Sequence, residues 1–306
     1  MDADSAQPYV LMLCGSFCFA CMGALAHAAG SECDWRIVAL VRALMPLVLM
    51  GSAAWAAGVQ IVLLRPRALW MRSISGSISL IGTFFALTRL PISDVFTLTN
   101  MFPVWVALLS WPLLGQKPSA TIWLSVVCGL AGVVLIQQPH LAAGNFATFV
   151  AVAISLFTAL AMIGLHRLRD VHILAVVVHF SMVSTLFAVA AFFLFASTRA
   201  VTPLAENHLW LRLGAMGLCA TAGQLFLTKA FTTGDPSKVS VVGLTQIVFA
   251  LVLDLAWLGH DVSAAKFVGM GLILGPTAWL LLSRQSGPPA SAAPAPDSGN
   301  LPEQGE

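Results

Sequence analysis

The sequence predicts an all-α integral membrane protein, with ten transmembrane helices arranged as two inverted five-helix repeats. Its composition is the first reason. Of its 306 residues, 58% are hydrophobic and only 9% are charged, whereas a soluble domain averages about 25% charged residues. The second reason is a series of apolar runs long enough to cross a bilayer, and the third is an internal repeat.

Ten apolar runs predict the membrane helices, because a helix needs roughly 20 apolar residues to cross the hydrocarbon core. The first run is not expected to be a cleaved signal peptide, since its leader carries Asp2 and Asp4 but no Lys or Arg. In chain order the runs are Tyr9–Ala29, Trp35–Ala57, Ser73–Thr88, Val95–Leu114, Thr121–Gln137, Phe146–Leu165, Ile173–Ala196, Leu209–Phe231, Val239–Leu258 and Ala264–Leu282.

The internal repeat predicts how these helices are grouped. Residues 86–120 and 230–264 align without a gap at an offset of about 144 residues. Because this offset spans about five helices, an odd number, the two halves are predicted to cross the membrane in opposite senses. The predicted segments are a cytoplasmic N-terminus (1–8), a first five-helix repeat (9–138), a second five-helix repeat (139–284) and a disordered cytoplasmic tail rich in Pro and Ala (285–306).

The basic residues of the short loops predict that both termini lie in the cytoplasm. With the N-terminus inside, nine Lys and Arg residues fall in inner segments, among them Arg72 in the loop before the third run, and five fall in outer segments. This is the excess expected of cytoplasmic loops. No basic cluster indicates binding to nucleic acid. The expected surroundings are therefore the lipid bilayer, and the expected partner is a small-molecule substrate.

Both copies of the repeat carry motifs. The first copy reads A-L-x-x-L-P-I-S-D-V and then F-P-V-W-V-A-L-L-S-W-P-L-L-G-Q, and the second reads A-F-T-T-G-D-P-S-K-V and then Q-I-V-F-A-L-V-L-D-L-A-W-L-G-H. These motifs resemble the EamA-type ten-helix members of the drug/metabolite transporter superfamily. The resemblance implies export or exchange of small metabolites across the cytoplasmic (inner) membrane, through a cavity between the two halves.

The chain also departs from the family pattern. Gln116 and His260 stand where the family usually has an acidic residue, and Ile247 stands at the position that matches Pro103 of the first half. Any role that the family gives to that acidic residue is therefore not carried over to this chain.

Polar residues near the middle of the fourth run are candidate substrate-binding residues. Pro103 cannot donate to the carbonyl four residues back, so the carbonyl of Thr99 is left free near the bilayer midplane. A free carbonyl at that depth is tolerated only against protein or in a water-filled cavity. Thr97 and Asn100 share a helix face, and they either line such a cavity or make ordinary interhelical hydrogen bonds.

The ninth run supplies the matching candidates. Inverted symmetry places Thr245 and Gln246 opposite the polar residues of the fourth run. Gln246 either packs near Gln224 or lines the pathway, because an amide is costly to leave facing lipid. Trp105 and its counterpart Phe249 are predicted to offer ring surfaces to an amphipathic or cationic solute, or else to be packing residues.

Arg42 and Asp254 are the two charges that lie most clearly inside predicted helices, so they are candidate gating or coupling residues. Both are predicted to lie roughly 7–11 Å below the outer face. At that depth their side chains can instead reach the interface by snorkelling, or form a static structural pair.

The sequence indicates no enzyme, metal site or cofactor. It has no Walker loop, no nucleophile elbow and no paired carboxylates. Cys14, Cys18 and Cys21 share one face of the first run, but the small residues around them favour a packing surface over a metal site. Gly271 and Gly275 form a GxxxG motif, which permits close helix approach within the chain or in a homodimer.

Taken together, these features predict a secondary transporter that moves a small organic metabolite by alternating access. The sparse fixed charge favours a neutral, zwitterionic or amphipathic solute over a polyanion, because a buried phosphate would need several Arg or Lys side chains. Two alternatives stay open, namely an uncoupled facilitator or channel-like pore, and a membrane scaffold that transports nothing.

Overall fold

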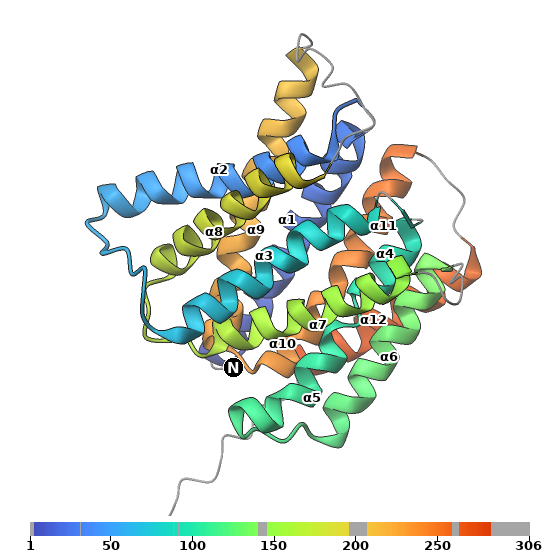
Figure 1. Ribbon diagram of the computed structural model, residues 1–306. Coiled ribbons are helices and arrows are strands. Elements are labelled where there is room, and N and C mark those ends of the chain that lie inside the picture. Colours follow the sequence, from blue (N-terminus) through green and yellow to red (C-terminus); the bar gives the residue numbers. More distant parts are fainter. Residues whose placement is uncertain are drawn as a thin grey trace, which may run out of the picture.

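The computed structural model describes residues 3–30, 32–87, 89–90, 92–139, 146–195, 207–258 and 263–282, and within these ranges every regular element is a helix (Figure 1). His260 and the predicted tail 285–306 lie outside the described residues. The helices are α1 (Ala3–Gly30), α2 (Trp35–Ala56), α3 (Arg67–Leu87), α4 (Ile92–Thr99), α5 (Phe102–Leu114), α6 (Ala120–Gln137), α7 (Phe146–His166), α8 (Ile173–Leu194), α9 (Asn207–Thr233), α10 (Pro236–Gly243), α11 (Thr245–Leu258) and α12 (Ala264–Leu282).

Eight helical segments of the described ranges are long and apolar enough to cross a membrane. Two of these segments are each made of two consecutive helices, α4 with α5 and α10 with α11. The segments are Ala6–Gly30, Trp35–Ala56, Ser93–Leu114, Ala120–Gln137, Thr148–His166, Ile173–Leu194, Pro236–Ala256 and Ala264–Leu282.

Two of the ten predicted spans, Ser73–Thr88 and Leu209–Phe231, are helical as α3 and α9 but are not among the eight. In α3 the polar residues that lower the hydropathy are Arg72 and a row of serines, and Arg72, Ser73, Ser75 and Ser77 are buried. The hydroxyl of Ser73, for example, lies 2.7 Å from Nδ1 of His179 in α8. Polar groups satisfied in this way can sit inside a membrane protein without the hydropathy of a lipid-facing helix. The count of ten transmembrane helices stays a prediction.

Helices from the beginning of the chain pack mainly against helices from its later part. α1 packs along α9, α2 along α8, and α3 along α7 and α8, and Figure 1 shows α3 and α7 running side by side. α6 packs along α12. The bundle is therefore interleaved, and its interior is lined by helices from both halves of the sequence.

Two breaks interrupt the helices that contain the predicted midplane residues. The first break separates α4 from α5 at Asn100 and Met101, just before Pro103, although the backbone N–H of Asn100 still bonds to the carbonyl of Phe96 across 3.0 Å. The second separates α10 from α11 at Leu244. Leu244 follows Asn100 by the repeat offset of 144 residues.

Side chains at the breaks bond to the backbone of their own helices. The side-chain amide of Asn100 donates to the carbonyl of Phe96 across 2.7 Å, and the hydroxyl of Thr245 donates to the carbonyl of Val242 across 2.7 Å. Bonds of this kind compete with the regular helical ladder. Both carbonyls also accept from backbone N–H groups, those of Asn100 and Leu244, so the side-chain bonds are additional to the helical ones.

Glycines allow α6 and α12 to come together. A Cβ atom added at Gly132 would lie 2.6 Å from the carbonyl oxygen of Gly269, and one added at Gly269 would lie 2.8 Å from the carbonyl oxygen of Gly132. The predicted GxxxG residues Gly271 and Gly275 are on the same helix, but a Cβ at either meets no atom within 4 Å. The close contact within the chain therefore uses Gly132 and Gly269 rather than the GxxxG pair.

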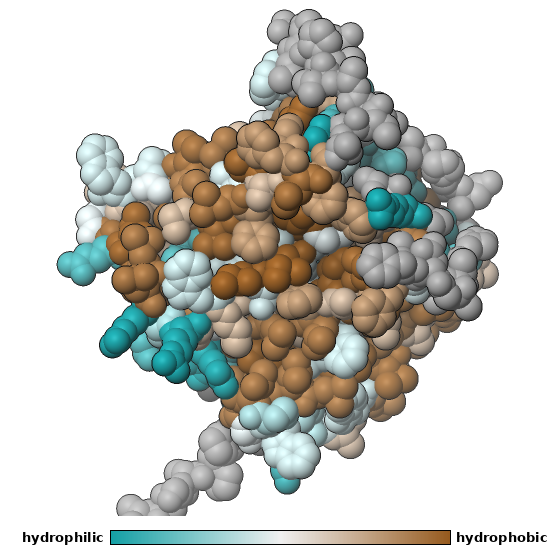
Figure 2. Space-filling model, viewed as in Figure 1, coloured by the Kyte–Doolittle hydropathy of each residue, from teal (hydrophilic) through white to brown (hydrophobic). Residues whose placement is uncertain are grey.

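The outer surface of the bundle is largely apolar. Figure 2 shows hydrophobic residues covering the middle of the visible face, with hydrophilic residues gathered near its margins. Large apolar side chains such as Phe149, Phe193, Leu211 and Trp279 are more than half exposed. A soluble protein rarely exposes so much contiguous apolar surface, so this surface fits a chain whose solvent is lipid.

Candidate functional site

A cavity of about 980 Å³ lies inside the bundle and is lined by residues of both halves of the sequence. Its walls come from α1, α2, α3, α7, α8 and α9, with contributions from α4, α5, α10 and α11 around the two breaks. The lining side chains used below are Met12, Phe19, His27, Asp34, Arg42, Arg72, Ser79, Thr83, Phe84, Arg89, Phe102, Thr158, Phe180, Gln224, Leu227, Phe231 and Gln246, together with the glycines Gly23, Gly76 and Gly243.

The two helix breaks meet at this cavity. A Cβ atom added at Gly243, the last residue of α10, would lie 2.9 Å from Met12 of α1 and 3.5 Å from Phe102, the first residue of α5. The hydroxyl of Ser16 in α1 donates to the carbonyl of Gly243 across 3.4 Å. The absence of a side chain at Gly243 thus brings the ends of two broken helices together against α1.

Two of the predicted site residues line the cavity, namely Gln246 and Arg42. Gln246 is in the first turn of α11, directly after the second break. Arg42 is in α2, and its guanidinium carbon lies 5.8 Å from the centre of the Phe19 ring. Arg42 therefore faces the interior of the bundle rather than snorkelling along its lipid-facing surface.

Thr97, Asn100, Trp105 and Thr245 are not part of the cavity lining. The hydroxyl of Thr97 donates to the carbonyl of Ser93 across 2.8 Å, and Asn100 and Thr245 bond within their helices as described above. The indole of Trp105 donates to the hydroxyl of Ser155 across 2.8 Å. These partners are intramolecular, and a role in binding stays a prediction for all four residues.

Phe249 and Asp254 of α11 are also outside the cavity lining. The Phe249 ring packs edge-on against Phe17, with 5.6 Å between the ring centres. Asp254 is exposed, and although it and Arg42 are both described, no ion pair joins them. The structure therefore does not bring together the two residues proposed for gating or coupling.

Arg72 is a cavity residue that the sequence analysis missed. It is 2% exposed, and its guanidinium carbon lies 4.0 Å from the centre of the Phe180 ring. Gly76, one helical turn later, makes room for it, because a Cβ atom there would lie 2.3 Å from Nη1 of Arg72. Arg72 was assigned to a cytoplasmic loop because the third helix was predicted to begin at Ser73. α3 begins at Arg67 instead, which places Arg72 more than a turn inside the helix.

Neither Arg42 nor Arg72 is neutralised by a residue that the structure describes. Within the described ranges, Arg42 and Arg72 make no side-chain hydrogen bond and no ion pair, and Nε of Arg72 is a buried polar atom without a partner. Arg72 is buried and Arg42 is partly buried, and buried charge without a partner is costly.

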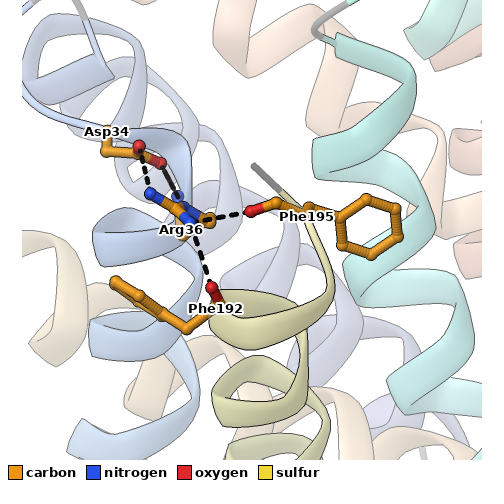
Figure 3. Close-up of polar contacts among 4 residues, drawn as sticks. All are labelled: Asp34, Arg36, Phe192 and Phe195. Atoms are coloured by element: carbon orange, nitrogen blue, oxygen red, sulfur yellow. Dashed lines mark hydrogen bonds and ion pairs between the residues drawn. The ribbon is translucent and has the colours of Figure 1, made fainter. Parts of the chain in front are cut away.

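The carboxylate that lines the cavity, Asp34, is already engaged by Arg36 (Figure 3). Nε and Nη2 of Arg36 donate to the two carboxylate oxygens across 3.1 and 3.0 Å, and Nη1 donates to the carbonyls of Phe192 and Phe195 across 3.1 and 2.8 Å. Asp34 also caps the start of α2. This cluster ties the start of α2 to the end of α8, where the carbonyls carry partial negative charge.

One end of the cavity is bordered by exposed side chains, and the other end is closed by buried apolar ones. One end reaches His27 and Arg89, whose side chains are exposed. At the other end Met12, Leu227 and Phe231 continue into a buried apolar cluster. The described structure is thus open toward the end of α1 and packed shut toward its beginning.

A polar contact reinforces the packed end. Nδ1 of His166, at the end of α7, lies 3.3 Å from the carbonyl of Phe231, and its Nε2 lies 3.4 Å from the Gln116 amide and 2.6 Å from Nη2 of Arg169. Gln116 stands at the position where the resemblance led us to expect an acid. In this chain Gln116 contacts His166, which in turn contacts the carbonyl of Phe231 at the packed end of the cavity.

Comparisons with known proteins agree with this architecture. The EamA-like transporter family matches residues 7–138 and 144–282. An uncharacterised transporter of Helicobacter pylori is 28% identical over 214 residues, covering 68% of this chain and 71% of that protein. The pseudopaline exporter CntI of Pseudomonas aeruginosa is 27% identical over 242 residues, covering 78% of this chain and 84% of that protein. A solved crystal structure has a TM-score of 0.75 at 19% identity, covers 89% of this chain and 95% of that chain, and shows the same fold.

Proposed function

The chain belongs to the EamA-like transporter family, and from that premise we propose that it is a secondary transporter that moves a small organic solute across the cytoplasmic (inner) membrane by alternating access. It is an integral, multi-pass membrane protein whose family and relatives are transporters rather than enzymes. The observation that carries the proposal is the cavity of about 980 Å³, lined from both halves and packed shut at one end.

Two inverted five-helix halves, residues 9–138 and 139–284, fit this mechanism. The family matches the chain in two successive stretches, 7–138 and 144–282, and the two helix breaks are separated by the repeat offset. If α4 with α5 and α10 with α11 each make one pass, and α3 and α9 also cross, the chain crosses the membrane ten times. Transporters built from inverted repeats bind solute at the repeat interface, next to interrupted helices.

Alternating access requires one end of the cavity to close while the other opens. With both termini in the cytoplasm, as the basic residues predict, the end at His27 and Arg89 faces outward and the seal of Met12, Leu227 and Phe231 faces the cytoplasm. The described structure then corresponds to an outward-open state. The inward-open state requires the apolar seal to part and the end near His27 to close.

The cavity suits an organic solute of modest size. Its volume is at the upper end of the roughly 300–1,000 Å³ that small-molecule sites span. Aromatic and aliphatic side chains alternate with a few polar ones, among them Ser79, Thr83, Thr158, Gln224 and Gln246. This composition supports an amphipathic solute, and the likeness to an exporter supports export or exchange as the direction.

Blocking the cavity with a side chain tests the proposal. Gly23 lines the cavity and a Cβ atom there meets nothing within 4 Å, so Gly23→Trp is expected to place a large ring in the cavity. Gly214 in α9 is matched in this respect but is outside the lining, so Gly214→Trp is the control.

The purified protein is first screened by thermal stability against amino acids, amines, organic acids, nucleosides and dyes, since a ligand at about 100 times its Kd adds roughly 2.7 kcal/mol to the folded state. Flux of each stabilising solute is then measured in proteoliposomes. Gly23→Trp is expected to abolish flux, and Gly214→Trp to preserve it. Equal flux through both variants contradicts transport through this cavity, and no flux of any solute by the folded wild type favours the scaffold alternative.

A further inference from the structure

We propose that Arg42 and Arg72 bind carboxylate groups of the transported solute, which makes the substrate an organic anion with an apolar body. This inference rests on the proposed function, because it assigns a substrate class to the same cavity. It keeps the amphipathic solute of the sequence-based expectation but replaces the neutral and zwitterionic ones, which were drawn while Arg72 was counted in a loop.

The positive charge of the cavity is the first argument. Arg42 and Arg72 both line it, and Asp34, the carboxylate of the described lining, is occupied by Arg36. Arg89 adds a third guanidinium at the exposed end. A cavity with unpaired cations and no spare carboxylate attracts anions and repels amines.

The placement of Arg72 is the second argument. Its side chain is nine-tenths or more buried, its Nε has no partner among the described residues, and Gly76 keeps open the space that the guanidinium occupies. The Phe180 ring holds the planar group from one face. A planar, oriented guanidinium with unused donors is suited to the two oxygens of a carboxylate.

The energetics favour a ligand over a purely structural role. A structural arginine at this depth is expected to be paired, since breaking a buried pair commonly costs about 3–5 kcal/mol. Arg72 is instead left without a counter-charge among the residues that the structure describes. A solute carboxylate would supply the missing counter-charge, and a dicarboxylate would neutralise both arginines.

The other residues that line the cavity indicate what the uncharged part of the solute is like. Phe19, Phe84 and Phe180 surround the two charges, with Gln224 and Gln246 as neutral hydrogen-bonding groups. Two arginines among aromatic rings suit carboxylates on a hydrocarbon or aromatic body. A nucleotide or another phosphate-rich solute would require more cationic groups than this.

The test uses a matched pair of probes on the full-length protein in nanodiscs. Benzylsuccinate carries two carboxylates and a ring, and its dimethyl ester has the same skeleton without charge. Binding is followed by calorimetry and by thermal stability, with 1,5-diaminopentane as the cationic probe and inorganic phosphate as the other anion. We expect benzylsuccinate to bind, and the ester, the diamine and phosphate to bind at least 10-fold more weakly.

Substitutions locate the site. Arg42→Gln and Arg72→Gln are each expected to raise the Kd for benzylsuccinate at least 10-fold, with Arg72→Lys intermediate because it keeps the charge but loses the planar fork. Arg212→Gln, which alters an exposed pair with Glu32, is expected to leave the Kd unchanged. Without ligand, Arg72→Gln is expected to be at least as stable as the wild type, since it removes a buried charge, whereas a structural arginine would destabilise on replacement.

Three outcomes overturn the proposal, namely equal binding of the ester, no benzylsuccinate binding at 10 mM, or binding that survives both Arg→Gln changes. Each of these leaves the proposed function standing if another solute is transported and Gly23→Trp blocks it. Loss of all flux from folded wild-type protein removes the proposed function as well.

Discussion

Replacing Gly132 by Ala is expected to force α6 and α12 apart. The added Cβ atom would lie 2.6 Å from the carbonyl oxygen of Gly269 and 2.8 Å from Cγ1 of Ile273. Because the first of these atoms is backbone, it cannot rotate away, and the two helices must shift. Overpacking of this kind costs about 1–3 kcal/mol. The same substitution recovers roughly 1 kcal/mol of helix propensity, so the net loss is expected to be about 0–2 kcal/mol.

The control is Gly275→Ala in α12, where the added Cβ atom meets nothing within 4 Å. That variant gains the helix propensity without the clash and is expected to be neutral or slightly more stable. Thermal unfolding of both variants in the same detergent, followed by tryptophan fluorescence, measures the difference. Equal midpoints for Gly132→Ala and Gly275→Ala, or a lower midpoint for Gly275→Ala, would refute the assigned α6–α12 contact.

Two further substitutions test the cluster at the start of α2 and the role of Trp105. Arg36→Met is expected to lower stability by about 3–5 kcal/mol because it removes the ion-pair partner of the buried Asp34 carboxylate. Arg212→Met, at an exposed pair, is expected to change stability by about 1 kcal/mol or less; similar unfolding midpoints for the two variants would contradict the cluster. Trp105→Phe removes one hydrogen bond to Ser155 and is expected to cost about 1 kcal/mol in chemical denaturation, with no change in ligand Kd; a large loss of affinity would instead support the predicted binding role of Trp105.

The sequence predicted the backbone best where a single residue type restricts it, as proline does. Pro103 removes a donor in the middle of an apolar run, and the structure has a break there. No proline marks the second break, yet Leu244 is displaced from Asn100 by the repeat offset. The second break was therefore not predicted from the sequence, and the structure is what places it at the repeat offset.

Side-chain direction was less predictable than backbone. Apolar runs locate helices, but a polar residue in such a run can bond within its own helix, as Thr97 and Thr245 do. It can also face a cavity, as Gln246 does. Both arrangements satisfy the same hydrogen-bonding demand, so the residue type cannot distinguish them.

The sequence analysis missed Arg72 as a cavity residue because it placed the start of the third helix too late in the chain. Hydropathy dropped at the polar start of α3, so Arg72 was placed in a loop, although the helix continues to Arg67. The segment is rich in serine, arginine and glycine, so its low hydropathy does not indicate a membrane helix. The structure explains why this segment is nevertheless helical inside the bundle. Gly76 leaves space for the guanidinium of Arg72, and the Phe180 ring packs against it.

The most direct test of alternating access is whether one cavity position is reached from both sides of the membrane in turn. Gly23→Cys is made in a chain whose six native cysteines are replaced by serine, reconstituted in liposomes, and treated with a membrane-impermeant maleimide from either side. The account predicts labelling from both sides, while the vesicles retain an entrapped sulfonated dye of the same size as the reagent. Labelling from one side only would contradict alternating access, and labelling from both sides with leakage of the dye would indicate a channel-like pore.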